Sequence, residues 1–160
     1  NFKILDEKSS ISGLNIIFIL GGNDLFHLKK TVENKIKENI CKNILNKCLK
    51  KKVPLIGICY GMQFIGKYFG LKLFKKKDVG RHKVYFLQKN KEKIMEVNSY
   101  HNYVIKKLNS NFTSLAYSKK DHTIEAMQYK NKKIVCFMWH PERELKFKKF
   151  DLRLIRSLCN

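Results

Sequence analysis

A cysteine between two glycines is the feature of this 160-residue sequence best suited to chemistry. Cys59 lies in Gly57-Ile-Cys-Tyr-Gly61, directly after the apolar run Val53 to Ile58. A nucleophile flanked in this way between a strand and a helix is typical of the elbow turn that exposes one reactive side chain above an α/β sheet. Because helix N-termini favour anions, the pattern predicts a nucleophilic Cys59 with a lowered pKa. The alternative is a small buried cysteine at a strand end, which is common.

A candidate general base follows a second apolar run. His140-Pro-Glu142 comes after Ile134 to Trp139, and residues two apart in an extended segment point to the same side. Glu142 is therefore expected to hold the imidazole of His140 in the tautomer whose other nitrogen faces Cys59. A lone His-x-Glu could equally be a surface pair. Since open α/β sheets place their sites at the carboxyl ends of parallel strands, the two motifs together predict a catalytic triad.

The first half of the chain contains the elements that would position this triad. Its apolar runs and helical periodicity predict alternating strands and helices, which favour parallel strands joined by crossovers. A tight loop, Gly21-Gly22-Asn-Asp24, follows the first strand. The predicted elements are strands at 15–20 and 53–58 and amphipathic helices at about 28–52 and 60–69.

Beyond Gly70 the apolar pattern changes to short segments of period two, which predict added antiparallel strands. These segments are 83–87, 93–97, 112–117, 124–129 and 134–139, with a hairpin turn at 131–133 and a closing helix over 150–158. The sequence therefore predicts one α/β domain over residues 1–160. Its sheet is expected to be flavodoxin-like, doubly wound and mostly parallel, with added antiparallel strands.

The charge of the chain is strongly positive, with 34 Lys and Arg against 13 Asp and Glu, a formal net charge of +21. Such a balance would suit nucleic acid, a membrane surface or an anionic ligand. The lysines are spread along the whole chain, however, and arginine, which base reading and bidentate phosphate binding favour, is rare. A solvated basic surface that attracts an anionic small molecule is favoured, and a nucleic-acid-binding module is the alternative from another class.

Cysteine spacing and hydropathy indicate which compartment and which kinds of ligand are expected for this protein. Five cysteines at irregular spacing contain no Cys-x-x-Cys pair, so reduced thiols in a cytoplasm are expected. No carboxylate and histidine cluster has the spacing of metal ligands, so neither a metal nor another cofactor is expected. The longest apolar runs are far shorter than the ~20 residues of a membrane-spanning helix, so no membrane association is expected.

Three motifs in combination resemble those of class I glutamine amidotransferase domains. They are Gly-Ile-Cys-Tyr-Gly-Met-Gln at 57–63, Trp-His-Pro-Glu at 139–142 and Leu-Gly-Gly-Asn-Asp at 20–24. The segments 98–102 and 139–143 are more similar to the γ-glutamyl hydrolase branch, which includes γ-glutamyl-γ-aminobutyrate hydrolases. Members of the family begin with a further strand and helix before the Gly-Gly loop, and that N-terminal part is expected to be missing from these 160 residues.

The resemblance implies roles for residues around Cys59. Backbone N–H groups near Gly22 and of Tyr60 would form an oxyanion hole, and Gln63 would help hold the α-amino acid end of a γ-glutamyl group. The residue types agree, because Tyr60 starts a predicted helix and glycines let backbone amides approach a ligand. Considered alone, Gly21-Gly22 could be a plain turn and Gln63 an exposed helix residue.

The segment from Asn98 to Tyr103 is expected to line the same pocket, with Tyr100 and His101 as the first candidates for substrate contact. A structural role for His101 is the alternative. The other histidines match no motif and are expected at the surface; they are His27, His82 and His122.

The resemblance also implies a reaction, the hydrolysis of a γ-glutamyl amide through a thioester on Cys59. The Met-Trp-His-Pro-Glu-Arg-Glu ending at 138–144 is similar to enzymes of capsular polysaccharide phosphoramidate biosynthesis that remove glutamate from γ-glutamyl-CDP-amidate. Arg143, Lys72 or Arg81 would then meet phosphate. The alternatives are γ-glutamyl-γ-aminobutyrate as substrate, and a glutaminase subunit that delivers ammonia to a separate synthase. Nothing in the sequence indicates an oligomeric state.

Overall fold

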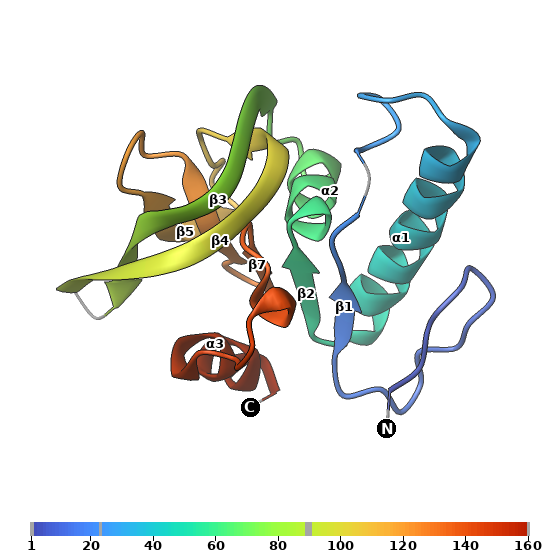
Figure 1. Cartoon of the computed structure of the whole chain (residues 1–160). Coiled ribbons are helices and arrows are strands. Elements are labelled where there is room, and N and C mark those ends of the chain that lie inside the picture. The colour runs from blue at the N-terminus through green and yellow to red at the C-terminus, as the bar shows by residue number, and fades with distance from the viewer. Residues whose placement is uncertain (1, 23, 89–90, 160) are drawn as a thin grey trace.

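The computed structural model describes residues 2–22, 24–88 and 91–159, in which helices cover both faces of one sheet of seven strands (Figure 1). In chain order the elements are β1 (Ile17–Ile19), α1 (Val32–Lys51), β2 (Leu55–Ile58), α2 (Tyr60–Tyr68), β3 (Leu73–Gln88), β4 (Lys91–Ile105), β5 (Phe112–Ser118), β6 (Ile124–Tyr129), β7 (Ile134–Phe137), the short 3-10 helix η1 (Pro141–Arg143) and α3 (Lys149–Cys159). The predicted α/β class is confirmed.

The strands run in the order β1-β2-β7-β6-β4-β3-β5. Strand β2 pairs in parallel with β1 on one side and with β7 on the other. Every residue of β2 and β7 is buried, as expected for central parallel strands covered on both faces. Since parallel strands end at the same edge, the segments that follow β1, β2 and β7 come together there.

The remaining strands pair only antiparallel among the described residues. The expectation of a mostly parallel sheet was therefore wrong, because parallel pairing is limited to β1, β2 and β7. Strands β3 and β4 are 16 and 15 residues long and form one hairpin, where the sequence predicted only 83–87 and 93–97.

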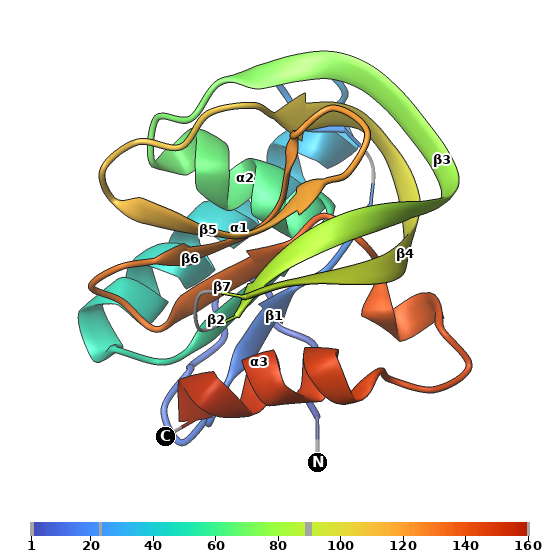
Figure 2. The same ribbon diagram turned by 90° about the vertical axis from the view of Figure 1, so that its left-hand side faces the viewer.

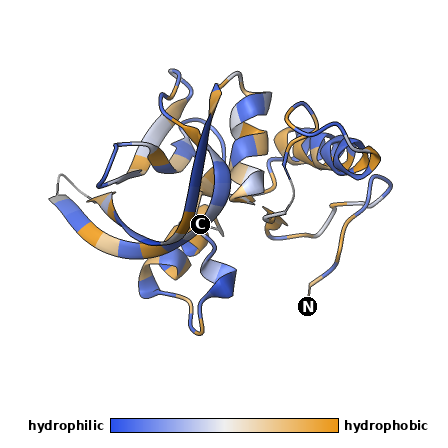
Figure 3. Ribbon diagram, turned by 45° about the horizontal axis from the view of Figure 1, so that its top comes forward, coloured by the Kyte–Doolittle hydropathy of each residue, from blue (hydrophilic) through white to orange (hydrophobic). Residues whose placement is uncertain are grey.

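This β3–β4 ribbon is strongly curved (Figure 2), and hydrophilic and hydrophobic residues are interleaved along it (Figure 3). Besides its long pairing with β3, strand β4 is joined to β6 through a single described residue pair, Ile105 opposite Ile124. With both faces of the ribbon partly exposed, no strict alternation marks its ends in the sequence. The hairpin between β6 and β7 and the closing helix α3 lie where they were predicted.

The hydrophobic core consists of two clusters, which contain residues of different helices. Helices α1 and α2 pack on one face of the sheet, while α3 packs on the other (Figure 2). Helix α1 buries Cys41, Ile44, Leu45 and Cys48, but Val32 and Ile36, which continue this apolar stripe towards the N-terminus, are exposed. The stripe is therefore confined to the C-terminal half of α1. No helix in the described part of the chain has the length and apolar character needed to cross a membrane.

Candidate active site

The turn between β2 and α2 holds Cys59 in the elbow conformation that the sequence predicted. Cys59 is the N-cap of α2 with φ of 50° and ψ of −99°, and its backbone N–H donates to Phe137 O at 2.8 Å. A Cβ at Gly61 would collide with the carbonyl of Ile19. Glycine at 61 thus lets α2 start directly against β1, and the positive φ of Cys59 is imposed by the packing on both sides.

The expected lowering of the Cys59 pKa is wrong in this structure. Burial raises the pKa of the Cys59 thiol to about 11, although the backbone N–H of Tyr60, the charge on Arg143 and the charge on Lys37 act in the opposite direction. The side chain is 4% exposed, so the cost of removing a thiolate from water outweighs the helix terminus. A proton acceptor is therefore needed to ionise Cys59.

His140 and Glu142 form the expected pair. Nδ1 of His140 lies 2.6 Å from Oε1 of Glu142. Burial acts to raise the pKa of Glu142, but the hydrogen bond to His140 and the charge on Arg143 outweigh it and lower that pKa. The pairing is made in η1 rather than in an extended segment, with Pro141 in the first turn. The Nε2 atom of His140 is buried and has no hydrogen-bond partner within the described residues.

The ring of His140 lies over the carboxyl end of β2. His140 follows β7, and Gly21 follows β1. A Cβ at Gly21 would collide with the His140 ring, so the ring reaches the end of β1. Strand β2 lies between β1 and β7. His140 also meets the ring of Tyr100 edge-on at 5.8 Å between centroids, while the Cys59 thiol lies 4.0 Å from the carbonyl oxygen of Tyr100. The structure therefore brings the nucleophile and base candidates together around Tyr100.

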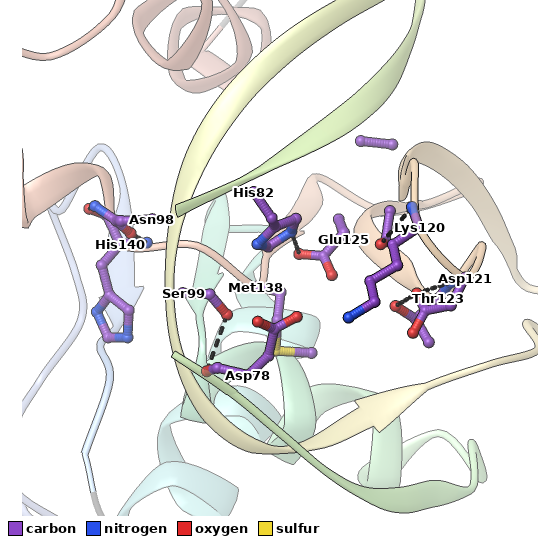
Figure 4. A network of polar contacts seen from close by, with 12 residues as sticks. Asp78, His82, Asn98, Ser99, Lys120, Asp121, Thr123, Glu125, Met138 and His140 are labelled. Atoms are coloured by element: carbon purple, nitrogen blue, oxygen red, sulfur yellow. Dashed lines mark hydrogen bonds and ion pairs between the residues drawn. The ribbon is translucent and has the colours of Figure 1, made fainter. Parts of the chain in front are cut away.

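Asn98 holds the backbone of His140 from the neighbouring ribbon. Its Oδ1 accepts from His140 N at 2.7 Å, and its Nδ2 donates to His140 O at 2.8 Å and to Glu144 at 3.0 Å. Figure 4 shows Asn98 against His140. The sequence placed Asn98 at the start of a pocket-lining segment and did not predict this clamp, which depends on the fold of β4.

A pocket of about 200 Å³ opens at this edge of the sheet. Five predicted site residues line it, namely Gly22, Cys59, Gln63, Tyr100 and His101, together with Asp24, Lys29 and Asn102. Asn102 belongs to the segment expected to line the pocket, whereas Asp24 and Lys29 were missed as site residues, since a polar loop residue carries no signal of its own. Gln63 is buried and donates from Nε2 to Tyr103 O at 3.1 Å, which excludes the alternative of an exposed helix residue.

The two residues with candidate oxyanion N–H groups, Gly22 and Tyr60, both lie close to Nζ of Lys37 of α1. Gly22 lines the pocket with Cys59. Tyr60 is buried at the start of α2, and its ring stacks on Phe64. Lys37 reaches both, and sequence reasoning did not identify it.

His101 lies between the pocket and a second group of buried ionisable residues. Burial lowers the pKa of His101, with Glu125 and Asp78 acting in the opposite direction. Behind it, His82 Nε2 lies 3.5 Å from Oε2 of the fully buried Glu125 (Figure 4). The prediction that His82 is a surface histidine was therefore wrong. His27 and His122 are exposed as predicted.

Among the described residues, the pocket is lined by no cysteine other than Cys59. Cys41, Cys48 and Cys136 are buried and free, and the side chain of Cys159 lies outside the described residues. Across residues 2–22, 24–88 and 91–159, no group of three or more His, Cys, Asp and Glu side chains is arranged to hold a metal ion.

Among the three predicted phosphate contacts, Arg143 lies beside the site. Its guanidinium lies over the Tyr100 ring at 4.7 Å from the centroid. Arg81 is paired with Glu96 and Glu144, and Lys72 is exposed between α2 and β3.

The sequence matches the family described as "Glutamine amidotransferase class-I" over residues 4–154. It is 38% identical over 132 residues to a "Gamma-glutamyl-CDP-amidate hydrolase" of Campylobacter jejuni, covering 82% of this chain and 64% of that protein. It is 27% identical over 133 residues to the "Putative glutamine amidotransferase-like protein YvdE" of Lactococcus lactis, covering 70% and 56%. A third relative, "Anthranilate synthase component 2" of Helicobacter pylori, is 28% identical over 100 residues, covering 58% and 50%. The chain thus spans between half and two thirds of the length of these relatives.

Solved structures share the fold. The crystal structure of a putative GMP synthase protein from Thermoplasma acidophilum superposes with a TM-score of 0.72 at 23% identity, covering 92% of this chain and 72% of that one. A glutamine amidotransferase from Thermotoga maritima superposes with a TM-score of 0.70 at 20% identity, covering 84% and 59%.

Proposed function

The chain belongs to the class I glutamine amidotransferase family, and from this premise we propose that it hydrolyses a γ-glutamyl amide bond through a Cys59, His140, Glu142 triad. The observation that carries the proposal is the state of His140. Its Nδ1 is bonded to Glu142 while its buried Nε2 is left without a partner in the described residues, at the edge where the Cys59 elbow lines a pocket. This is the arrangement of an oriented base beside a nucleophile.

The chemistry follows from the protonation states. Cys59 starts as a thiol, because burial raises its pKa to about 11. His140 takes its proton through Nε2 as the sulfur adds to the γ-carbonyl carbon, and the carbonyl π electrons move to oxygen near the N–H groups of Gly22 and Tyr60. The C–N bond then breaks as His140 gives the proton to the leaving nitrogen, which leaves a glutamyl thioester. His140 next deprotonates water, which adds to the thioester and releases glutamate and the Cys59 thiol.

We assign the amino acid end of the substrate to the pocket. Gln63, Tyr100 and His101 remain the candidates for contact, joined by Asp24 and Lys29, whose opposite charges suit the α-ammonium and α-carboxylate of a glutamyl group. The pocket volume of about 200 Å³ supports the binding of this small part of the substrate.

For the leaving group we propose CDP-amidate, in capsular polysaccharide phosphoramidate biosynthesis. The name of the Campylobacter relative supports this choice, as do the Arg143 guanidinium beside the Cys59 site and the net charge of +21. A glutaminase subunit serving a separate synthase is the second candidate, because the relatives include an anthranilate synthase component 2.

The deciding experiment measures glutamate release by the purified protein from glutamine, γ-glutamyl-γ-aminobutyrate and γ-glutamyl-CDP-amidate. We expect turnover without a partner and a kcat/KM at least about tenfold higher for the nucleotide conjugate than for glutamine, equivalent to roughly 1.4 kcal/mol of transition-state binding. Cys59→Ala should abolish release, whereas Cys48→Ala, in the buried half of α1, should retain it. Glutamine hydrolysis that appears only with a synthase would favour the second candidate.

A further inference from the structure

A lysine of helix α1 lies next to the two residues whose backbone N–H groups are proposed to bind the oxyanion, Gly22 and Tyr60. Nζ of Lys37 donates to the carbonyl oxygen of Gly21 at 3.3 Å, and it lies 3.7 Å from the centroid of the Tyr60 ring. Helix α1 runs beside β1 and the loop that follows it (Figure 1). Lys37 therefore connects the Gly21-Gly22 turn to the residue that follows the nucleophile.

The contact with Gly21 determines which way the next N–H points. In a planar trans peptide the carbonyl and the following N–H point in opposite directions. Because the oxygen of Gly21 is held towards Lys37, the N–H of Gly22 is directed away from α1. A Cβ at Gly22 would collide with Nζ of Lys37, so Lys37 also occupies the space on that side of the turn.

This peptide needs an anchor because glycine lies on both sides of it. Two successive glycines allow the peptide between them to rotate at little steric cost. That freedom lets the backbone approach a ligand, but it also leaves the direction of the Gly22 N–H unspecified. A hydrogen bond from a charged donor is stronger than one between neutral groups, so the contact with Lys37 favours one orientation of this peptide.

The local charge is consistent with this role. Lys37 is partly buried, which lowers the pKa of its ammonium group, while Cys41 and Cys59 act to raise that pKa. The same ammonium group lies close enough to Cys59 to favour its thiolate. A positive charge here therefore opposes neither the thiolate nor an oxyanion formed next to it.

We propose that Lys37 is a positioning residue that holds the Gly21-Gly22 peptide with the Gly22 N–H directed at the oxyanion. The role rests on the proposed hydrolase function. When the Cys59 sulfur adds to the γ-carbonyl carbon, the π electron pair moves to oxygen, and the negative charge develops where the oriented N–H group is available. The oriented N–H group therefore stabilises the tetrahedral state and not the bound substrate.

The test compares Lys37→Met, which keeps the aliphatic stem, with Lys37→Arg, which restores a charged donor. We expect Lys37→Met to lower kcat about 10- to 100-fold, below the 10²–10³-fold typical for loss of an oxyanion donor itself, with KM changed less than about threefold. Lys37→Arg should recover most of kcat. Lys47→Met is the matched control, since Lys47 of α1 also donates to backbone carbonyls, those of Glu7 and Ser9, away from the site. It should retain kcat.

A second measurement reads the tetrahedral state directly. Glutamate γ-semialdehyde should add to Cys59 as a thiohemiacetal that needs the oxyanion site, whereas glutamate binds without such an adduct. Lys37→Met should weaken binding of the aldehyde about as much as it lowers kcat and should leave glutamate binding nearly unchanged. Equal kcat and equal aldehyde affinity in Lys37→Met and wild type would overturn the Lys37 role alone. A wild-type protein that turns over no γ-glutamyl substrate and forms no adduct would overturn the hydrolase function and this role together.

Discussion

The parallel and antiparallel halves of the sheet contribute to the site in different ways. Strands β1, β2 and β7 have three or four residues each, and they present Cys59 and His140 at their carboxyl ends. Strand β4 has 15 residues in a ribbon of which much is exposed, and it presents Asn98, Tyr100 and His101. The proposed proton and acyl transfers thus belong to the buried half, while the ribbon supplies support and a pocket wall.

Different interactions hold the site residues of the two halves in place. Buried parallel strands fix the elbow through backbone bonds such as Cys59 N–H to Phe137 O. Among the described residues, the ribbon pairs with the rest of the sheet through three residues of β5 and one of β6, and specific side-chain contacts add to these links. The bonds from Asn98 to the N–H and carbonyl of His140, at 2.7 and 2.8 Å, are among these links. Changes in the two halves should therefore have separable effects.

The largest effect is expected in the parallel half. His140→Asn should lower kcat about 10⁴-fold, because the proton acceptor for Cys59 is lost. Glu142→Gln should lower kcat by a factor about a hundred times smaller than His140→Asn does, since it disturbs only the orientation of the imidazole ring. Steady-state glutamate release with unchanged circular dichroism measures both. Near wild-type turnover in His140→Asn would contradict the triad and make His101 the candidate base.

A smaller effect should follow from breaking the link between the halves. Asn98→Ala removes both bonds to the His140 backbone, so we expect kcat to fall about 10- to 100-fold and the free energy of unfolding to fall by about 1–3 kcal/mol. Asn109→Ala is the control, because Asn109 also bonds a backbone carbonyl, that of Phe69, but on the exposed surface. Equal kinetics in both variants would show that the ribbon does not support catalysis.

Leaving-group recognition should be affected next. Arg143→Gln is expected to lower the ratio of kcat/KM for γ-glutamyl-CDP-amidate over glutamine about tenfold, because a guanidinium that meets phosphate is lost. Arg156→Gln on α3 should keep the wild-type ratio. Added salt should reduce the same ratio in wild type and less so in Arg143→Gln. An unchanged ratio in Arg143→Gln would contradict a phosphate contact at this residue.

The smallest effect concerns His82 in the antiparallel half. Burial acts to lower the pKa of His82, but its hydrogen bond with Glu125 and the nearby carboxylates raise that pKa above the ordinary value. A raised folded-state pKa stabilises the fold below the unfolded pKa of about 6.5, and this stabilisation is lost as pH rises through the folded value. Tm measured from pH 5.5 to 8.5 should therefore show the wild-type advantage over His82→Gln shrinking as pH rises. A Tm difference between wild type and His82→Gln that grows with pH would contradict a raised pKa for His82.

Much of the parallel half could be predicted from local sequence. The runs that became β2 and β7 are continuous and apolar because every residue of those strands is buried, and the run that became β1 buries two of its three residues. The elbow around Cys59 and the pairing of His140 with Glu142 involve residues at most a few positions apart. Short-range patterns of this kind can be recognised without a fold.

The antiparallel ribbon and the electrostatics could not be predicted in this way. The full length of β3 and β4 is set by pairing along the hairpin. The pKa of Cys59 follows from its burial by several elements and is raised, although the helix terminus alone predicts a lower value. The contact of the partly buried His82 with Glu125 likewise joins residues far apart in the chain.

The sequence by itself determined which groups could act, because residue types and short spacings fix the elbow, the histidine and carboxylate pair and the glycine loop. Tertiary structure alone decided what surrounds those groups. Lys37 meets Gly21 and Tyr60, and Asn98 meets His140, only because α1 and β4 pack against the parallel strands. Burial and long-range contacts depend on the path of the whole chain, and no local pattern records them.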